Sequence, residues 1–186
     1  SLLDANGKEI ASVTDAPIDF TLESAVLWNA EKPYLYTLLI ETEKETITQK
    51  VGFRDIKISA KQELLINGVS VKIKGVNRHD THPVYGHAIP LDEIRAELLQ
   101  MKRFNINAIR TSHYPNTSEF LNLCDEIGFY VIDEADIETH GFVFWHKEKG
   151  YRPFDENMPA ENPLWRKAMV DRIERLVARD KNHPAV

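Results

Sequence analysis

The sequence predicts an α/β fold in which three strand–helix units build a parallel sheet, preceded by part of an antiparallel β-sandwich. Up to about residue 60 the chain carries short runs that are rich in β-branched residues and partly alternating, which is typical of strands. Beyond residue 70 short apolar runs are each followed by a segment with helical periodicity. Successive units of this kind join through right-handed crossovers, so we expect their strands to lie parallel.

The first part of the chain contains three predicted strands, and a predicted hairpin follows them. The strands cover residues 36–42, 46–51 and 55–59. Within residues 63–74, Asn67 and Gly68 stand between two apolar runs, and Asn-Gly readily takes the positive φ angles of a two-residue turn. We expect residues 1–56 to form a β-rich unit with few contacts to the rest of the chain.

The second part of the chain carries the strands of the predicted parallel sheet. They are expected at residues 71–76, 107–111 and 129–133. The last of them is nearly all apolar, as in a parallel strand that is covered on both faces. A helix opens at Pro90, where no N–H bond is lost, and it carries Ile94, Leu98 and Met101 on one face.

Two more helices are predicted after this one. In the first, Asn116 and Glu119 have the spacing of a capping box, and Gly128 stands at the exit. Its apolar positions follow the helical period at Phe120, Leu123, Cys124 and Ile127. The last helix starts at Asn162 and stops before Pro184. We expect it to bury Trp165, Met169, Ile173, Leu176 and Val177.

Composition indicates an ordinary globular protein. The 186 residues are 42% hydrophobic, and 29 acidic against 23 basic side chains give a net charge of −6, which disfavours a nucleic-acid partner. No apolar stretch approaches the roughly 20 residues that span a bilayer, so we expect no membrane partner.

The single cysteine, Cys124, forms no internal disulfide, and we expect it in the core. We expect a cytoplasmic protein; the chain opens in mid-pattern at Ser1, which leaves open whether a targeting segment was removed.

Polar residues gather where each of the three predicted parallel strands ends. These patches are residues 77–82, 110–116 and 133–140. Five of the seven histidines lie in or next to them. Because the carboxyl ends of parallel strands form one rim, the patches predict a single pocket, although loops are polar in any case.

Two pairs of residues in these patches suggest chemistry. Glu138 and His140 are two apart and project to the same side of an extended backbone, where they offer an oxygen and a nitrogen ligand. This set suits Mg²⁺ or Mn²⁺ better than a closed zinc site, and the alternative is a surface ion pair. Arg110 is suited to a carboxylate and His113 to a sugar hydroxyl; alternatively, Arg110 is a structural partner of Glu134.

Three strings of sequence resemble the large β-galactosidases of glycoside hydrolase family 2. They are GVNRH at residues 75–79, RTSHYPN at residues 110–116 and DEADIETHG at residues 133–141. Upstream, residues 27–36 and 51–54 resemble the end of that family's immunoglobulin-like domain and its junction with the catalytic barrel. The ETHG string favours the galactosidase branch over the β-glucuronidases, which share strings like the first two.

The resemblance implies a domain organisation. Residues 1–58 would be part of an immunoglobulin-like β-sandwich domain. Residues 59–186 would be the first three strand–helix units of a TIM (β/α)8 barrel, the N-terminal part of the catalytic domain.

The resemblance also implies roles for individual residues. A catalytic role falls on His79, His113 and Arg110, of which the arginine holds the nucleophilic carboxylate. Substrate binding falls on His79, His113 and Asn116, and Mg²⁺ ligation on Glu138 and His140. Glu134 would contact these functional residues without binding the ligand itself. The roles of Asp80, His82 and Trp145 stay open.

The implied function is retaining hydrolysis of terminal β-D-galactosides such as lactose. In the family the acid/base glutamate follows the fourth barrel strand and the nucleophile comes later, so both are expected outside these 186 residues. We therefore expect the chain alone to be inactive, and the full-length enzyme to need the remaining barrel segments and to be oligomeric. The alternatives are a β-glucuronidase-like or β-mannosidase-like glycosidase, and a non-catalytic sugar-binding or complementing module.

Overall fold

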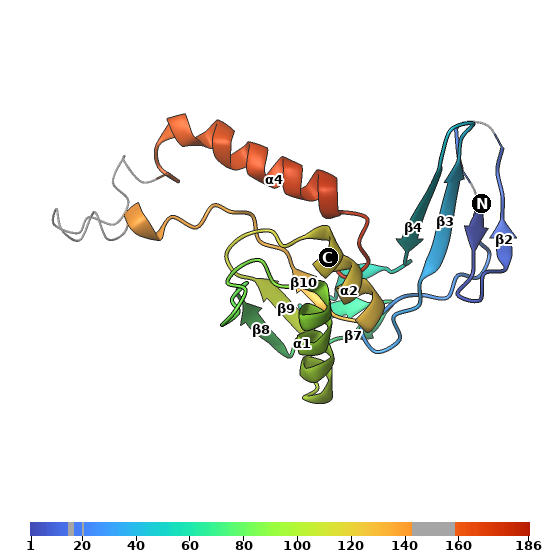
Figure 1. The fold of residues 1–186 in the computed structure, drawn as a ribbon, viewed down its shortest axis with the longest axis horizontal. Coiled ribbons are helices and arrows are strands. Elements are labelled where there is room, and N and C mark those ends of the chain that lie inside the picture. Colours follow the sequence, from blue (N-terminus) through green and yellow to red (C-terminus); the bar gives the residue numbers. More distant parts are fainter. Residues whose placement is uncertain (15–16, 20, 143–158) are drawn as a thin grey trace.

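The computed structural model describes residues 1–14, 17–19, 21–142 and 159–186. These residues form an antiparallel sheet at one end, a small three-stranded sheet, and a parallel sheet beside helices α1 and α2 (Figure 1). The predicted fold class, an α/β partial barrel preceded by a β domain, is confirmed. No helix of the described part is long and apolar enough to span a bilayer.

The antiparallel sheet has four strands in the order β2-β1-β3-β4. They are β1 (Leu2–Leu3), β2 (Glu9–Ala11), β3 (Tyr36–Glu41) and β4 (Thr46–Val51). The long pair β3–β4 aligns Tyr36 with Val51, and it matches two of the predicted strands. Most of β4 is exposed, so both faces of this edge strand are open in the described residues.

The small sheet contains the predicted hairpin. Its strands are β5 (Ile56–Ile58), β6 (Leu64–Ile66) and β7 (Val69–Ser70). Asn67 and Gly68 have φ angles of 53° and 79°, which are the positive values that the turn requires. Asn67 also donates from Nδ2 to the carbonyl of Trp28 at 2.9 Å, so the turn is tied to the preceding domain.

The parallel sheet has the order β10-β9-β8, and its strands are β8 (Gly75–Arg78), β9 (Ala108–Thr111) and β10 (Tyr130–Ile132). The first strand starts four residues later than the prediction of residues 71–76. Pairing begins at Gly75 opposite Ala108. Immediately before it, the Lys74 N–H donates to the Asn107 side-chain oxygen at 2.8 Å, and the Asn107 N–H donates to the Lys74 carbonyl at 2.9 Å. Val71 instead donates its N–H to the carbonyl of Leu64 in the small sheet.

Helices α1 (Leu91–Arg103) and α2 (Ser118–Ile127) supply much of the core. The fully buried apolar side chains of this core include Trp28, Leu98, Ile109, Phe120, Leu121, Cys124 and Phe129. The core position predicted for Cys124 is confirmed, and burial raises the pKa of its thiol well above the ordinary value.

The N-cap of α2 is Thr117, one residue after the predicted Asn116. The Thr117 hydroxyl accepts from the N–H of Phe120 at 3.2 Å. The capping-box prediction was wrong because the Asn116 amide donates to Asp80, as described below.

The burial predicted for the last helix was wrong. A short 3-10 turn, η1 (Pro163–Trp165), leads into α4 (Arg166–Asp180), and the helix stops before Pro184 as expected. Trp165, Ile173 and Val177 are 41%, 44% and 49% exposed, and Met169 and Leu176 are half-buried. The reason is that α4 meets the described core chiefly at its C-terminal end, where Asp180 is its one buried residue, and extends away from the sheet (Figure 1).

The expectation that residues 1–56 make few contacts with the rest was also wrong. Trp28 is fully buried in the common core, and its indole N–H donates to the carbonyl of Asp125 on α2 at 2.8 Å. Lys102 on α1 donates to the carbonyl of Ala30 at 2.9 Å. A large indole stabilises a structure most where apolar side chains surround it, and the buried cluster that contains Trp28 includes side chains of α1, α2, β9 and β10.

Gly128, which ends α2, gives a first stability prediction. Its φ is +93°, and a β-carbon there would lie 2.3 Å from the carbonyl oxygen of Ala30. We expect Gly128→Ala to lower the free energy of unfolding by about 2 kcal/mol, measured by urea denaturation. The control is Gly7→Ala, where φ is +82° and no atom lies within 4 Å of the added carbon. Equal losses for both variants would mean that the contact with Ala30 contributes nothing.

Candidate active site

The carboxyl ends of β8, β9 and β10 meet on one rim, as predicted. The His79 ring, which follows β8, lies edge-on to the His113 ring, which follows β9, with centroids 5.3 Å apart. Glu134, which follows β10, contacts His113 and Arg110. Three patches that are distant in sequence therefore come together in one place.

Arg110, His113 and Glu134 form a tight cluster, which we call the rim cluster. The Glu134 carboxylate pairs with Arg110 Nε at 2.7 Å and with His113 Nδ1 at 2.9 Å. Arg110 also donates from Nη1 to the Asn77 side chain at 3.3 Å. All three members are partly exposed, so the cluster is accessible at the rim. The cluster unites a cation, an imidazole and a carboxylate.

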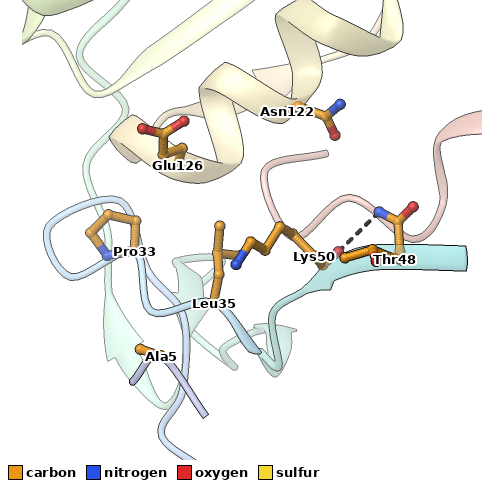
Figure 2. A pocket seen from close by; sticks show the side chains of 8 residues that line it. Ala5, Pro33, Leu35, Thr48, Lys50, Asn122 and Glu126 are labelled. Carbon is orange, nitrogen blue, oxygen red and sulfur yellow. Dashed lines mark hydrogen bonds between the residues drawn. The ribbon is translucent and has the colours of Figure 1, made fainter. Parts of the chain in front are cut away.

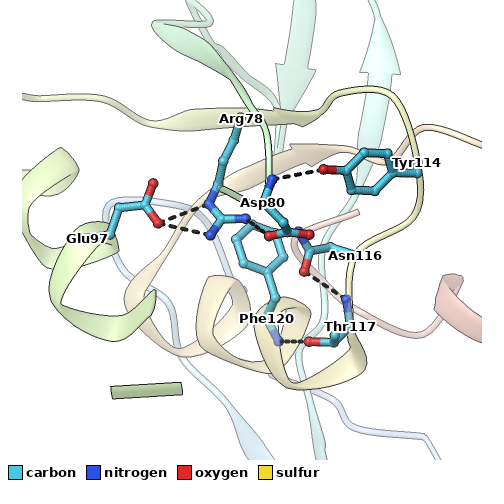
Figure 3. A network of polar contacts seen from close by, with 7 residues as sticks. All are labelled: Arg78, Asp80, Glu97, Tyr114, Asn116, Thr117 and Phe120. Carbon is cyan, nitrogen blue, oxygen red and sulfur yellow. Dashed lines mark hydrogen bonds and ion pairs between the residues drawn. The ribbon is translucent and has the colours of Figure 1, made fainter. Parts of the chain in front are cut away.

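A second network surrounds the buried guanidinium of Arg78 (Figure 3). Arg78 donates from Nε and Nη2 to Glu97 at 3.1 and 2.9 Å and from Nη1 to Asp80. Its guanidinium also lies over the Phe120 ring, 4.9 Å from the centroid. Burial alone would lower the pKa of Arg78, but the bonds with Glu97 and Asp80 outweigh burial and raise it.

Asn116 belongs to this second network. Its amide donates to both oxygens of Asp80 at 3.2 Å, and its side-chain oxygen accepts from the N–H of Thr117 at 2.8 Å (Figure 3). The Asp80 N–H in turn donates to the Tyr114 hydroxyl at 2.9 Å. The substrate-binding role of Asn116 stays a prediction, since its side chain faces Asp80 rather than the rim cluster.

A third cluster of charges lies under the rim, between β10 and the end of α4. Arg179 donates from Nε and Nη2 to the two oxygens of the fully buried Asp180 at 2.6 and 2.7 Å. Asp133 faces the same carboxyl and accepts from the Thr111 hydroxyl at 3.4 Å. Burial, followed by the neighbouring Asp180, raises the pKa of Asp133 to about 7. No local sequence pattern predicts this cluster, because its members come from separate elements.

The two predicted metal ligands lie next to each other. Glu138 Oε1 and His140 Nδ1 are 2.8 Å apart, and both side chains are exposed. In the described residues no group of three or more His, Cys, Asp or Glu side chains is arranged to hold a metal ion. This pair offers one oxygen and one nitrogen donor, a set that fits Mg²⁺ or Mn²⁺ as two ligands of a larger shell. Trp145 lies outside the described residues.

The last residues of the chain pack beside β10. The N–H of Val131 donates to the carbonyl of Ala185 at 2.7 Å. The buried Asp125 on α2 accepts from the N–H of Ala185 at 2.9 Å and contacts His183 Nδ1 at 2.6 Å. This buried His–Asp pair was not predicted, since a histidine near a proline-containing turn has no distinguishing sequence pattern.

A cavity of about 540 Å³ lies away from the rim, between the antiparallel sheet and α2 (Figure 2). Its lining comprises Ala5, Pro33, Leu35, Thr48, Gln49, Lys50, Asn122 and Glu126. None of the rim residues contributes to it. The rim cluster, and not this cavity, is therefore the candidate active site.

Comparison with protein families and curated proteins supports a single assignment. Residues 56–186 match the model described as glycosyl hydrolases family 2, TIM barrel domain, and residues 1–54 match glycosyl hydrolases family 2. The β-galactosidase of Actinobacillus pleuropneumoniae is 41% identical over the whole chain, and that of Arthrobacter sp. (strain B7) is 44% identical over 94% of it. The chain spans 20% and 17% of the length of these two relatives.

Solved structures agree with this assignment at the level of the fold. The apo β-glucuronidase of Ruminococcus gnavus superposes with a TM-score of 0.82 at 28% identity, and the chain covers 31% of it. The β-D-glucuronidase of Dictyoglomus thermophilum also gives 0.82, at 25% identity, with 32% of it covered. Both superpositions cover the whole of this chain. The chain therefore belongs to glycosyl hydrolases family 2.

Proposed function

We propose that this chain acts as part of a retaining β-galactosidase that hydrolyses terminal β-D-galactosides such as lactose. The observation that carries the proposal is the 41% to 44% identity with β-galactosidases across 94% to 100% of the chain. Because the chain spans about a fifth of those relatives, further barrel segments would complete the site, and an oligomeric assembly belongs to the same proposal.

The described residues would bind and orient the sugar. His79 and His113 would form hydrogen bonds with sugar hydroxyls, and Arg110 would hold a carboxylate. A retaining glycosidase needs an acid/base carboxyl and a nucleophilic carboxylate about 5 Å apart. In our proposal neither is Glu134, whose two oxygens already face Arg110 and His113. Both catalytic glutamates would come from other segments.

Mg²⁺ is part of the proposal, with Glu138 and His140 as two of its protein ligands. When bound, the ion would supply positive charge that orients water and sugar hydroxyls near the rim. An Mn²⁺ ion would suit the same two donors. The contact of 2.8 Å between Glu138 Oε1 and His140 Nδ1 supports the proposal, because it shows that the two groups lie close enough to bind one ion.

Replacing Glu138 tests the metal proposal. In the natural-length gene product, Glu138→Gln should weaken Mg²⁺ binding by about tenfold or more, since a charged ligand is lost while the shape is kept. Calorimetric titration with Mg²⁺ measures the affinity directly, and excess Mg²⁺ should restore much of the glycosidase activity. Asp136→Asn, in the same loop, is the control. A loss of activity that excess metal leaves unchanged, with unaltered Mg²⁺ affinity, would contradict the proposal.

An aryl-glycoside panel tests the substrate class. The natural-length gene product should turn over the p-nitrophenyl β-D-galactoside with the highest kcat/KM, ahead of the glucuronide and the mannoside. The second candidate is a β-glucuronidase, which the structural likeness to two such enzymes favours. Preference for the glucuronide would select it. No turnover of any member would favour a non-catalytic sugar-binding or complementing module.

A further inference from the structure

Glu134 links the end of β10 to two side chains that belong to β9 and the loop after it. Its Oε2 lies 2.7 Å from Arg110 Nε, and its Oε1 lies 2.9 Å from His113 Nδ1. The N–H of Glu134 also donates to the hydroxyl of the buried Thr111 at 2.9 Å. Both the main chain and the side chain of Glu134 are therefore anchored, and its side chain is only 22% exposed.

Arg110 is held from two sides. Glu134 Oε2 forms an ion pair with Nε at 2.7 Å, and the Asn77 side-chain oxygen on β8 accepts from Nη1 at 3.3 Å. Because a guanidinium is planar and its donors are fixed in direction, rotation of Arg110 would break one of these bonds. The N–H groups that these bonds leave over remain available for a ligand.

The orientation of the His113 ring follows from the same carboxylate. A carboxylate only accepts, so the contact between Glu134 and Nδ1 places the ring proton on Nδ1. Arg110 Nη2 also lies 3.2 Å from this nitrogen and would need it as an acceptor, but the contact with the Glu134 carboxylate is shorter, at 2.9 Å, and favours the proton on Nδ1. Nε2 is then the nitrogen that His113 presents to a ligand.

We propose that Glu134 is a positioning residue, whose carboxylate fixes the rotamer of Arg110 and the tautomer of His113 before a sugar binds. The inference rests on the proposed glycosidase function. Long side chains that are free to rotate lose conformational entropy when a ligand orders them. Side chains that are already held act on the transition state without that loss.

The first test is kinetic, in the natural-length gene product and on its best glycoside. Glu134→Gln keeps the size of the side chain but removes the charge and one acceptor oxygen. We expect kcat to fall about 10-fold to 100-fold with a smaller change in KM. Glu134→Asp, which keeps the charge, should retain more activity than Glu134→Gln. The control is Glu126→Gln, which removes a glutamate from an exposed ion pair with Arg95 at 2.7 Å and should leave kcat unchanged.

A double-mutant cycle separates positioning from a general structural effect. In a His113→Ala background, Glu134→Gln should cost clearly less than it costs in the wild type, because part of its effect acts through His113. Losses that multiply fully in the two backgrounds, or an unchanged kcat for Glu134→Gln, would overturn the inference.

A crystallographic test does not depend on activity. In crystal structures of the Glu134→Ala and Glu134→Gln variants, Arg110 and His113 should leave the rotamers that they adopt in the wild type. Side chains that stay in place in both variants would overturn the inference. A wild type that hydrolyses no glycoside of the panel would reject the proposed function alone, and the crystal structures would still decide whether Glu134 positions its neighbours.

Discussion

His113→Ala is expected to lower kcat of the natural-length protein on its best glycoside by about 30-fold to 1,000-fold. Glu134 holds the Nδ1 side of the ring at 2.9 Å, which leaves Nε2 for a sugar hydroxyl. That hydrogen bond would strengthen as the sugar approaches an oxocarbenium ion, so its loss should affect kcat more than KM. A bond of this kind contributes about 2 to 4 kcal/mol in the transition state.

Steady-state kinetics on the purified variant measure this effect, and the melting temperature shows whether the fold is intact. The matched control is His87→Ala, because His87 is an exposed histidine of the loop that follows β8, outside the rim cluster. It should keep nearly the full kcat. A loss below about threefold for His113→Ala, with an unchanged melting temperature, would place His113 among the structural residues.

The fold was predictable where the signals are local. Asn67 and Gly68 define a turn by their own φ preferences, and the structure has positive φ angles at both. Burial was not predictable where it depends on a distant partner. Ile173 and Val177 have helical periodicity, but periodicity alone does not identify the element that would cover an apolar face, and both side chains are exposed. Trp28 shows the reverse case, since it lies in the β-rich segment and packs in the core of the barrel units.

The candidate site was predictable to the extent that strand ends converge. Arg110 and His113 follow from the rule that parallel strands present their carboxyl ends on one rim. The structure contains the ion pair between Arg110 and Glu134 that the alternative prediction named, and the role of Arg110 toward a ligand stays a prediction. The contact between Asp133 and Asp180 could not be inferred, because α4 brings Asp180 back under the rim from a position 47 residues later. The cis peptide bond between Ser112 and His113 could not be predicted either, because cis bonds are expected almost only before proline.

The raised pKa of Asp133 predicts that the free energy of unfolding falls as pH rises from about 4 to about 7. The Asp133 carboxyl faces Asp180, Arg179 and the Thr111 hydroxyl. Arg179 pairs with both oxygens of the buried Asp180, and the buried Oδ2 of Asp133 has no hydrogen-bond partner. A proton on one of the two carboxyls would supply the missing donor. This agrees with the pKa of Asp133, which burial and Asp180 raise from 3.8 to about 7.

The sign of the effect follows from that direction. Because the folded state holds the proton more tightly than the unfolded state, the contribution is fully present below pH 4 and is lost as pH approaches 7. Such a change in pKa corresponds to at most about 4 kcal/mol, and we expect about 2 kcal/mol because Asp180 and Arg179 respond together. Hydrogen exchange of peptides that cover β10 and the end of α4 measures it locally, as a protection that falls by at most about tenfold per pH unit.

Asp133→Asn should remove this pH dependence. The Asn amide donates to Asp180 at every pH, as the protonated carboxyl does, so protection of the same peptides should stay level between pH 4 and pH 7. Asp136→Asn is the control, because Asp136 is exposed, pairs with Arg172 at 3.3 Å and should leave the wild-type slope intact. An equal slope in the wild type and in Asp133→Asn would show that the two carboxyls share no proton, and that the end of α4 is held by Arg179 alone.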